Sequence, residues 1–328
     1  MRYLENVGLP SDKPVSRVGL GTWQFGSGEW GYGAEYDATE AGRIVARAAE
    51  LGITLFDTAE AYGFGRSERI LGRALEEHGL RDSAVVATKL FPLLPVAPVV
   101  RRRAAASAAR LGVDRIDLYQ VHQPNPVVRD GFTMPGMRDL QDAGVIGAVG
   151  VSNYSLDRWQ QAERDLGRPV LSNQVQLSLA HLGPLDDLVP YAAARGRMVI
   201  AWSPLAQGFL SCRYDATHRP SSAVRAMNPL FLEESLVRAA GLLDALRDVA
   251  GTHGVTPAQV ALAWLIHHPA VVAIPGASSV AQVEANAAAA DISLTDDEVA
   301  ELTAQARAFE HLGVVAAVRG VAGRLLRR

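Results

Sequence analysis

The chain has 328 residues, of which 48% are hydrophobic and 20% are charged, and its formal net charge is −3 at pH 7. This balance is ordinary for a globular protein and excludes an intrinsically disordered chain. Because positive and negative charges are mixed along the chain, no overall field favours a nucleic acid as partner.

The N-terminus and the single cysteine indicate the compartment. The first residues lack the apolar segment of a signal peptide, and no apolar stretch is long enough for a membrane-spanning helix. Cys212 has no second cysteine with which to form a disulfide, which favours a reducing cytoplasm. Of the 32 lysines and arginines only Lys13 and Lys89 are lysine, and we expect Lys13, in a proline-flanked turn, to be incidental.

In chain order, short runs rich in valine, isoleucine and leucine alternate with segments whose apolar residues recur every three or four positions. Several of these segments end at glycine, as helices do. Eight strand–helix units predict a single-domain (β/α)8 TIM barrel over residues 1–328, with an open doubly wound sheet as the alternative. The predicted strands are residues 18–22, 53–58, 84–89, 116–122, 148–153, 172–176, 198–203 and 271–276.

Two parts of the chain depart from the regular repeat. Residues 203–271, after the seventh strand, must hold a long loop as well as helix, and such loops commonly carry function. The C-terminal extension ends in a basic tail, residues 311–328. We expect this tail to be a packed or frayed end, the alternative being a helix that binds a membrane surface or a partner.

Three successive predicted strands end in an acid, a lysine and a histidine, and the C-terminal strand ends carry the chemistry of a barrel. These residues are Asp57, Lys89 and His122, and Tyr62 follows in the same loop as Asp57. Each has a simpler explanation when taken alone: a turn or helix cap, a solvated charge, a loop aromatic or a core histidine. Their joint placement at one barrel mouth favours a catalytic group.

These four side chains are suited to the reduction of a carbonyl group. A tyrosine hydroxyl has an ordinary pKa near 10, and a nearby ammonium would lower that pKa by stabilising the phenolate. Asp57 can hold Lys89 in place, and His122 can orient a carbonyl oxygen beside Tyr62. Since no side chain supplies a hydride, such a site implies a reduced nicotinamide cofactor.

Other chemistries have weaker support. Residues 26–31 formally match a dinucleotide-binding glycine pattern, but no helix follows directly and Trp30 would crowd a pyrophosphate turn. We therefore interpret this loop as a wall of the substrate pocket. The histidines and the single cysteine show no zinc-binding spacing, so no metal is expected, and no hydrolase elbow or P-loop occurs.

Eight segments resemble the aldo-keto reductases, in the order found in that family. The resemblance spans roughly residues 18–291, and its block DTAEAYG at 57–63 is very specific. It is closest to the branch that contains the β subunits of voltage-gated potassium channels. The segments are VGLGTW (18–23), LFDTAEAYGFGRSERILGRAL (55–75), TK (88–89), DLYQVHQP (117–124), GVSNYS (150–155), NQVQ (173–176), AWSPLAQGFL (201–210) and IPGASSVAQVEAN (274–286).

The resemblance implies that Tyr62 is the general acid, that Asp57 and Lys89 tune it, and that His122 orients the carbonyl. It also implies a cofactor site around the barrel mouth, with the nicotinamide stacked on Trp202 and the adenosine end along residues 276–286. The expected cofactor-binding residues are Gly21, Thr22, Trp23, Asp57, Ser152, Asn153, Gln174, Trp202, Ser203, Pro204, Leu205, Gln207, Gly208, Arg213, Gly276, Ser278, Gln282 and Asn286.

NADPH is the expected cofactor, with NADH as the alternative. Many family members have a basic residue in the stretch 276–279 that binds the 2′-phosphate of NADPH, whereas this chain has Ser278 and Ser279 there. The missing charge could come from Arg213 or Arg225 in the long loop.

The expected function is NADPH-dependent reduction of an aldehyde or ketone. The alternative is a cofactor-binding regulatory subunit like the channel β subunits, which carry asparagine where this chain has His122. An aromatic pocket would accept apolar aldehydes and ketones, quinones included, whereas Gln24 and Gln123 could bind the hydroxyls of a sugar. The expected residues of this pocket are Trp23, Trp30, Phe64, Phe91 and Gln123.

Overall fold

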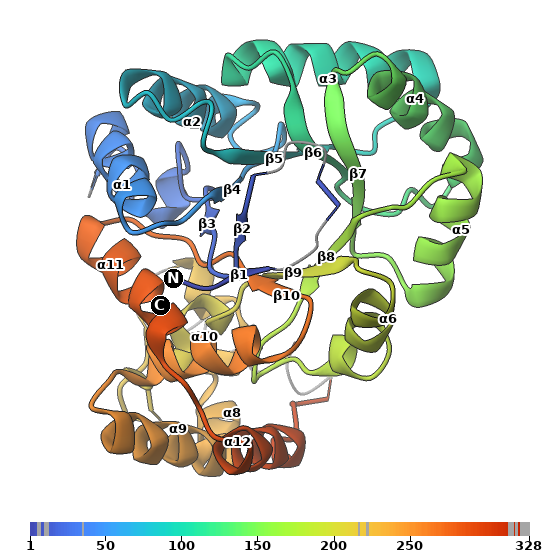
Figure 1. Cartoon of the computed structure of the whole chain (residues 1–328). Helices are drawn as coiled ribbons and strands as arrows, with labels where there is room; N and C mark the ends of the chain where they lie inside the picture. Colours follow the sequence, from blue (N-terminus) through green and yellow to red (C-terminus); the bar gives the residue numbers. More distant parts are fainter. Residues whose placement is uncertain are drawn as a thin grey trace.

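The computed structural model describes residues 1–4, 8–9, 13–34, 36–215, 217–220, 223–313, 318 and 321. In this part of the chain eight parallel strands form a ring and helices surround it, as Figure 1 shows. Each predicted strand overlaps one observed strand, so the expected barrel is confirmed. The strands are β3 (Leu20–Gly21), β4 (Leu55–Asp57), β5 (Val85–Leu90), β6 (Ile116–Val121), β7 (Ile146–Ser152), β8 (Ser172–Gln176), β9 (Met198–Trp202) and β10 (Val271–Ala273).

The first and last strands of the sheet are joined, which excludes the open doubly wound alternative. The sheet order runs from β10 to β3 without interruption. The backbone N–H of Gly19 donates to the carbonyl of Ala273 at 2.8 Å, and the N–H of Ala273 donates to the carbonyl of Arg17 at 2.9 Å. A closed ring of parallel strands leaves no edge strand and directs every strand's C-terminal end to one mouth.

Several helices begin at a residue whose side chain accepts from the free backbone N–H groups of the first turn. Asp37 accepts from the backbone N–H groups of Thr39 and Glu40 at the start of α1, and Thr256 forms a capping box with Gln259 at the start of α10. The helices are α1 (Ala38–Glu50), α2 (Arg66–Glu77), α3 (Ala97–Leu111), α4 (Asp130–Asp142), α5 (Leu156–Leu166), α6 (Leu188–Ala194), α7 (Ala223–Ala226), α8 (Glu233–Arg238), α9 (Ala240–His253), α10 (Pro257–His267), α11 (Val280–Ala288) and α12 (Asp296–Ala308).

The barrel interior is filled by alternate residues of the strands. Leu55, Val85, Leu118 and Ile200 belong to one buried apolar cluster inside the ring. Because side chains alternate between the two faces of a strand, the next inward positions after this apolar layer lie at the C-terminal end of the barrel. The apolar layer therefore forms the floor beneath the polar strand ends.

An N-terminal hairpin, which the sequence did not predict, closes the opposite end of the barrel. It pairs β1 (Tyr3–Leu4) with β2 (Val15–Ser16), lies across the ring of strands in Figure 1, and contributes Val15 to the interior apolar cluster. The expectation that Lys13 is incidental is wrong. Its Nζ donates to the carbonyl of Ala84 at 2.7 Å and to Oδ2 of the buried Asp117 at 3.3 Å. The lysine thus ties the hairpin to β5 and β6.

Replacing Lys13 with methionine is expected to lower the free energy of unfolding by about 1–3 kcal/mol, because a buried carboxylate loses a charged donor. Asp117 would keep only the backbone N–H of Val86 at 2.9 Å among the partners that the described residues offer. Urea denaturation measures the loss. Arg43→Met, which breaks an exposed pair with Glu40, is the matched control and should cost less than about 0.5 kcal/mol. Equal effects of the two substitutions would contradict the anchoring role.

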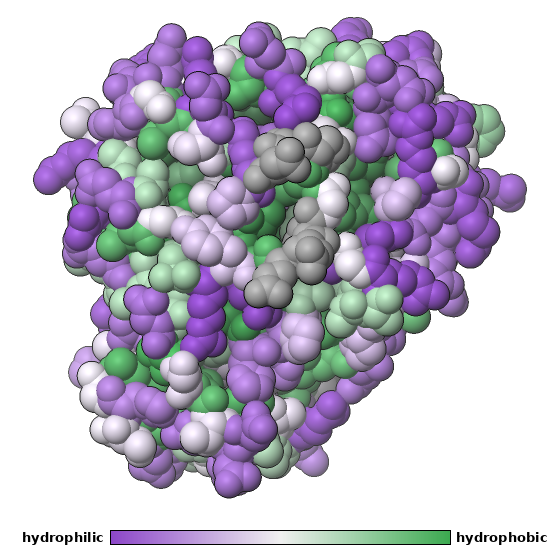
Figure 2. All heavy atoms as spheres, in the orientation of Figure 1, coloured by the Kyte–Doolittle hydropathy of each residue, from purple (hydrophilic) through white to green (hydrophobic). Residues whose placement is uncertain are grey.

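The predicted stretch of loop and helix, residues 203–271, first holds irregular chain with short helical turns at Ala206–Ser211, Ala223–Ala226 and Pro229–Phe231, and then α8, α9 and α10. In Figure 1, α8, α9 and α12 lie together on the outer side of α10. Figure 2 shows, in the same view, hydrophilic side chains over most of the outer helices. None of the helices in the described residues combines the length and apolarity that a membrane span requires. Most of the basic tail, residues 311–328, lies outside the described residues.

Candidate active site

Polar side chains replace the apolar layer at the C-terminal end of the barrel. Asp57 follows Leu55 on the inward face of β4, and Lys89 follows Val85 and Ala87 on β5. Gln174 lies on β8, where it is paired in register with Ser152 of β7. The period of two that fills the barrel with apolar groups therefore brings an acid, a base and an amide to one mouth.

Lys89 is the centre of the site. Its side chain is fully buried, and its Nζ donates to Oδ1 of Asp57 at 2.5 Å, to the carbonyl of Thr58 at 2.8 Å and to the hydroxyl of Tyr62 at 3.2 Å. Three acceptors satisfy all three N–H groups of the ammonium. Burial alone would lower the pKa of Lys89, but the charge of Asp57 and the contact with Tyr62 outweigh it and raise that pKa. Lys89 is therefore an ammonium at neutral pH.

Tyr62 reaches Lys89 from the loop that follows β4, and the ammonium lies 4.9 Å from the centre of the tyrosine ring. The expectation that the ammonium lowers the pKa of the hydroxyl below its ordinary value is wrong for this state of the protein. Burial of the phenolate raises the pKa of Tyr62 by more than Lys89 lowers it, and Asp57 adds to the rise. The hydroxyl thus stays protonated at neutral pH, as a proton donor must.

His122 faces the tyrosine from the end of β6. The two rings are 5.7 Å apart between centroids and stand at 81°, and Phe91 lies edge-on to the imidazole at 6.4 Å. Burial, reinforced by the charge of Lys89, lowers the pKa of His122 to about 3. The imidazole is therefore neutral, with one N–H to donate, and its buried Nδ1 has no hydrogen-bond partner among the described residues.

The free energy of unfolding is expected to fall as the pH drops below about 6.5. In the unfolded chain His122 takes up a proton near pH 6.5, whereas the folded pKa of about 3 keeps it neutral, so its contribution is complete above 6.5 and is lost towards pH 3. His122→Asn should flatten the dependence between pH 4 and 6.5, measured by urea denaturation at each pH. Part of the slope remains, because the pKa of His268 is also lowered, to about 4, by burial first.

His218→Asn is the matched control for this experiment, since His218 is exposed. The control should leave the slope unchanged. A His122→Asn protein with the wild-type slope would show that His122 is not held neutral by the fold.

Aromatic side chains form one wall of the mouth. Trp23 and Trp30 lie edge to face at 5.4 Å, and Trp23 also faces Tyr62 at 6.4 Å, so Trp23 stands beside the tyrosine and Trp30 packs against Trp23. Phe64 does not join them: it is 94% exposed and has no ring contact in the described part of the chain. Gln123 is also exposed. Three of the five expected pocket residues are therefore brought together.

The residues expected to hold a carboxamide form one connected network at the ends of β7, β8 and β9. Ser152 donates to the carbonyl of Gln174 at 2.8 Å, and Gln174 donates to Oδ2 of Asp57 at 2.7 Å. Asn153 donates to Ser152 at 3.1 Å and accepts from the indole N–H of Trp202 at 3.1 Å. These contacts fix the amide groups and leave acceptor lone pairs, so the residues fit a flat carboxamide.

The loop after β9 has a backbone suited to an anion. Ser203, Gln207 and Gly208 all have positive φ, and this stretch also contains Pro204 and Leu205. Residues with positive φ bend the backbone sharply, and bends of this kind can direct backbone N–H groups towards a phosphate. The segment fits the pyrophosphate role that the sequence predicts.

Side chains from farther along the long loop hold this segment in shape. Arg225 donates to the carbonyl of Gln207 at 2.8 Å and lies over the ring of Trp30 at 5.6 Å. Arg225 therefore links the loop after β9 to the loop after β3, across the mouth.

The residues expected at the adenosine end lie along the start of α11. Ser278 donates its backbone N–H to Gln282 at 2.9 Å, and Asn286 donates to the carbonyl of Gly276 at 3.4 Å. A Cβ at Gly276 would lie 1.9 Å from the terminal amide of Gln24, so a larger residue there would require that side chain to move. Gly276 also forms a β-bridge with Gly21, which brings the first and last strand ends together.

Two expected cofactor residues are placed differently from the rest. The hydroxyl of Thr22 is buried and bonds to Ser67 at 2.8 Å, so its side chain faces the protein and only its backbone adjoins the mouth. Arg213 is exposed and forms no ion pair within the described residues.

Gln120 and Ser172 are site residues that the sequence reasoning missed. Gln120 is paired in register with Lys89 and donates to Oδ2 of Asp57 at 3.4 Å, while Ser172 donates to Gln120 at 3.2 Å. A Cβ at Gly150 would lie 2.2 Å from the hydroxyl of Ser172, so this glycine makes room for the pair. The alternation from Leu118 to position 120 was the available signal, since it places Gln120 inward.

The chain was compared with known proteins. The model of the Aldo/keto reductase family matches residues 17–307. An uncharacterized oxidoreductase of Mycobacterium tuberculosis is 59% identical over 309 residues, which cover 94% of both chains. The structure of glycerol dehydrogenase from Gluconobacter oxydans is similar with a TM-score of 0.82 and 28% identity, covering 94% of this chain and 97% of that one. An aldo/keto reductase from Klebsiella pneumoniae, solved with NADP and acetate, has a TM-score of 0.72 and 30% identity, covering 91% and 94%.

Proposed function

The chain belongs to the aldo/keto reductase family and is an NAD(P)H-dependent oxidoreductase, and from this premise we propose that Tyr62 is the general acid in the reduction of an aldehyde or ketone. The observation that carries the proposal is the buried Lys89, which joins Asp57 to the hydroxyl of Tyr62. Burying an ion pair adds little to the free energy of unfolding, so a buried lysine bonded to a tyrosine at the mouth of a barrel indicates a role in catalysis. The closer likeness to the channel β subunits stays a prediction from the sequence.

The site's own residues can perform the proton transfer. Tyr62 donates its hydroxyl proton to the carbonyl oxygen, and Lys89 stabilises the phenolate that remains. Asp57 balances the charge of Lys89 and keeps its Nζ directed at the hydroxyl. His122, being neutral, donates a hydrogen bond to the same carbonyl oxygen and orients it. The carbonyl oxygen thereby becomes the hydroxyl of an alcohol, and Tyr62 is left as a phenolate beside the ammonium of Lys89 until it regains a proton.

A nicotinamide cofactor fits the residues around this group. Bound there, the reduced cofactor supplies the hydride that reaches the carbonyl carbon. Asn153 and Gln174 would hold its carboxamide, Trp202 would lie against its ring, and the 203–208 segment would hold its pyrophosphate. The solved relative from Klebsiella pneumoniae, which contains NADP, supports the choice of NADPH.

The cofactor proposal also requires protein groups that would bind the 2′-phosphate of NADPH. Arg225 is already engaged by Gln207 and Trp30, so we assign it to the pyrophosphate segment rather than to the adenosine end. Arg213, which forms no ion pair within the described residues, then remains as the charged group for the 2′-phosphate, together with Ser278, Ser279 and the backbone at the start of α11.

The aromatic wall favours an apolar carbonyl substrate over a sugar. Trp23 presents ring surface to Tyr62 and Phe91 presents ring surface to His122, while Trp30 extends the wall behind Trp23. The amide of Gln24 lies against Gly276 instead, which removes one of the two groups that could bind sugar hydroxyls.

Steady-state assays with a panel of aromatic aldehydes, aliphatic aldehydes, quinones and open-chain sugars test the proposal, each run with NADPH and with NADH. We expect turnover of the apolar carbonyls and a lower KM for NADPH. Cofactor binding without turnover of any member would instead support the regulatory-subunit alternative. Preferred turnover of sugars would contradict the assigned substrate class while leaving the catalytic group intact.

A further inference from the structure

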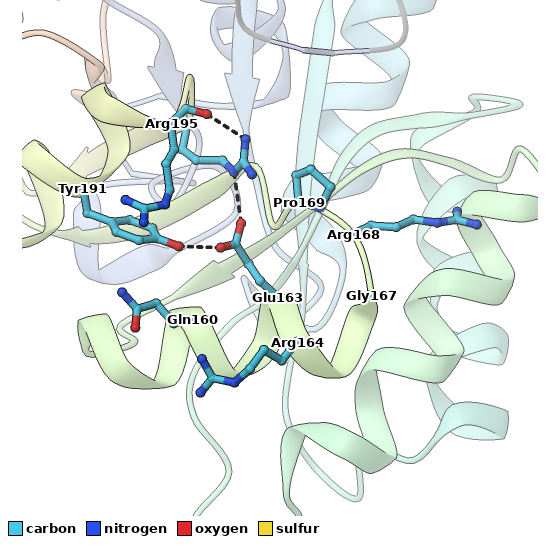
Figure 3. A pocket seen from close by; sticks show the side chains of 9 residues that line it. Gln160, Glu163, Arg164, Gly167, Arg168, Pro169, Tyr191 and Arg195 are labelled. Atoms are coloured by element: carbon cyan, nitrogen blue, oxygen red, sulfur yellow. Dashed lines mark hydrogen bonds and ion pairs between the residues drawn. The ribbon is translucent and has the colours of Figure 1, made fainter.

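A surface pocket of about 560 Å³ lies at the end of the barrel opposite the catalytic group. It is bounded by the C-terminal halves of α5 and α6 and by the residues that lead into β8 and β9, as Figure 3 shows. Four arginines line it, namely Arg164, Arg168, Arg195 and Arg197. The pocket is shallow and open to solvent, and nothing in the carbonyl-reduction site makes use of it.

One arginine of the pocket is neutralised within it. Glu163 accepts from Nε of Arg197 at 3.0 Å, from the backbone N–H of Val170 at 3.1 Å and from the hydroxyl of Tyr191. In Figure 3 the carboxylate lies between the tyrosine and the neighbouring guanidinium. Burial first, and then the hydrogen bond to Glu163 and the charge of that carboxylate, raise the pKa of Tyr191 to about 12, so its hydroxyl remains a donor. Three donors occupy this carboxylate, and its charge cancels that of Arg197.

A second arginine is neutralised from outside the pocket. Arg168 donates to Oδ1 of Asp142 at 2.6 Å, and in Figure 3 its side chain points away from Glu163. Arg168 therefore contributes little charge to the pocket itself.

The other two arginines have no carboxylate within 4 Å in the part of the chain that the structure describes. Arg164 donates to the neutral Oε1 of Gln161 at 2.7 and 3.1 Å, and that amide in turn donates to Asp165 at 2.9 Å. Arg195 stacks over the ring of Tyr191, with its guanidinium carbon 4.3 Å from the ring centre. In Figure 3, Arg195 and Arg164 lie on opposite sides of Glu163. The pocket thus presents two held, uncompensated guanidinium groups.

We propose that this pocket binds a small molecule that carries a phosphate group. The two arginines without a carboxylate partner leave the pocket with a net positive charge, which attracts the charge of about −2 on a phosphate monoester at neutral pH. The planar guanidinium group can donate two parallel hydrogen bonds to the oxygens of a phosphate. The cation–π contact with the ring of Tyr191 fixes the position of the Arg195 guanidinium. The remaining volume accommodates the organic part of the molecule. This site is independent of the proposed carbonyl reduction.

Isothermal titration of the full chain with inorganic phosphate, at constant ionic strength set with chloride, tests the proposal. Wild type should give saturable heat, and Arg164→Gln/Arg195→Gln should bind phosphate at least about tenfold more weakly, because charge-assisted hydrogen bonds to both groups are lost. Arg73→Gln/Arg102→Gln removes the same charge from exposed positions on α2 and α3, and this control should bind as wild type does. Phosphate held at the cofactor site would be unaffected by either double variant.

Three outcomes would overturn the proposal. They are an absence of saturable heat, equal binding by the pocket variant and wild type, and an equal loss of binding in the control variant. Thermal unfolding of each variant checks its folding; because both substituted side chains are exposed, the melting temperatures should stay close to that of wild type.

Discussion

Replacing Tyr62 with phenylalanine is expected to abolish carbonyl reduction while leaving the affinity for the cofactor nearly unchanged. The substitution removes one hydroxyl, which accepts from Lys89 at 3.2 Å and is the proposed proton donor. General acid catalysis contributes about 10²- to 10⁴-fold to rate, so kcat should fall by at least that range. Steady-state kinetics measures kcat, and fluorescence titration with NADPH measures cofactor affinity separately.

Tyr119→Phe is the matched control for this experiment. Tyr119 lies on β6, is fully buried, and its hydroxyl has no hydrogen-bond partner among the described residues. Removing that hydroxyl should leave kcat unchanged and should not destabilise the protein. A Tyr62→Phe enzyme with wild-type kcat would rule out Tyr62 as the general acid, whereas a loss of cofactor affinity would place the tyrosine in binding instead.

Replacing Lys89 is expected to impair both catalysis and folding. Lys89→Met leaves the buried Asp57 without its charged partner, which should cost about 3–5 kcal/mol in the free energy of unfolding. Catalysis should also be lost, because the phenolate of Tyr62 would have no ammonium to stabilise it. Lys89→Arg keeps the charge, but its planar fork is larger and cannot make the same three contacts in a fully buried space, so turnover should also fall severely.

The double variant Asp57→Asn/Lys89→Met separates the two effects. It removes both charges of the buried pair, so it should recover much of the stability lost in Lys89→Met while remaining inactive. Urea denaturation and steady-state kinetics on the same preparations measure the two quantities. Normal turnover by Lys89→Arg would show that Lys89 has only a structural role. Recovery of activity in the double variant would contradict the role of Lys89 in catalysis.

The catalytic group could be predicted from the sequence because each member ends a strand or follows one closely. The barrel requires only that short apolar runs alternate with amphipathic segments, and the parallel arrangement then brings all strand ends together. The strand ends alone were enough to place Asp57, Lys89 and His122 at one mouth, without any interatomic distance. Gln120 could have been added by the same argument, since it shares the inward face with Leu118.

Tertiary structure decided the properties that depend on contacts between distant segments. Lys13 and Asp117 are an ion pair across more than a hundred residues, and no local pattern connects them. The direction of the pKa shift of Tyr62 also depends on a balance, because burial competes with the charge of Lys89 and only the folded site sets both.

Local sequence therefore determined which elements form and which chemical groups their ends carry. The reason is that the spacing of apolar residues along a short segment decides whether that segment forms a helix or a strand. Charge was different. Arg164 and Arg195 look like ordinary surface arginines in the sequence, and only the packing of α5 and α6 shows that no carboxylate of the described residues reaches them. Whether a charge is paired, buried or free depends on which segments meet in space, and that is settled by the fold as a whole.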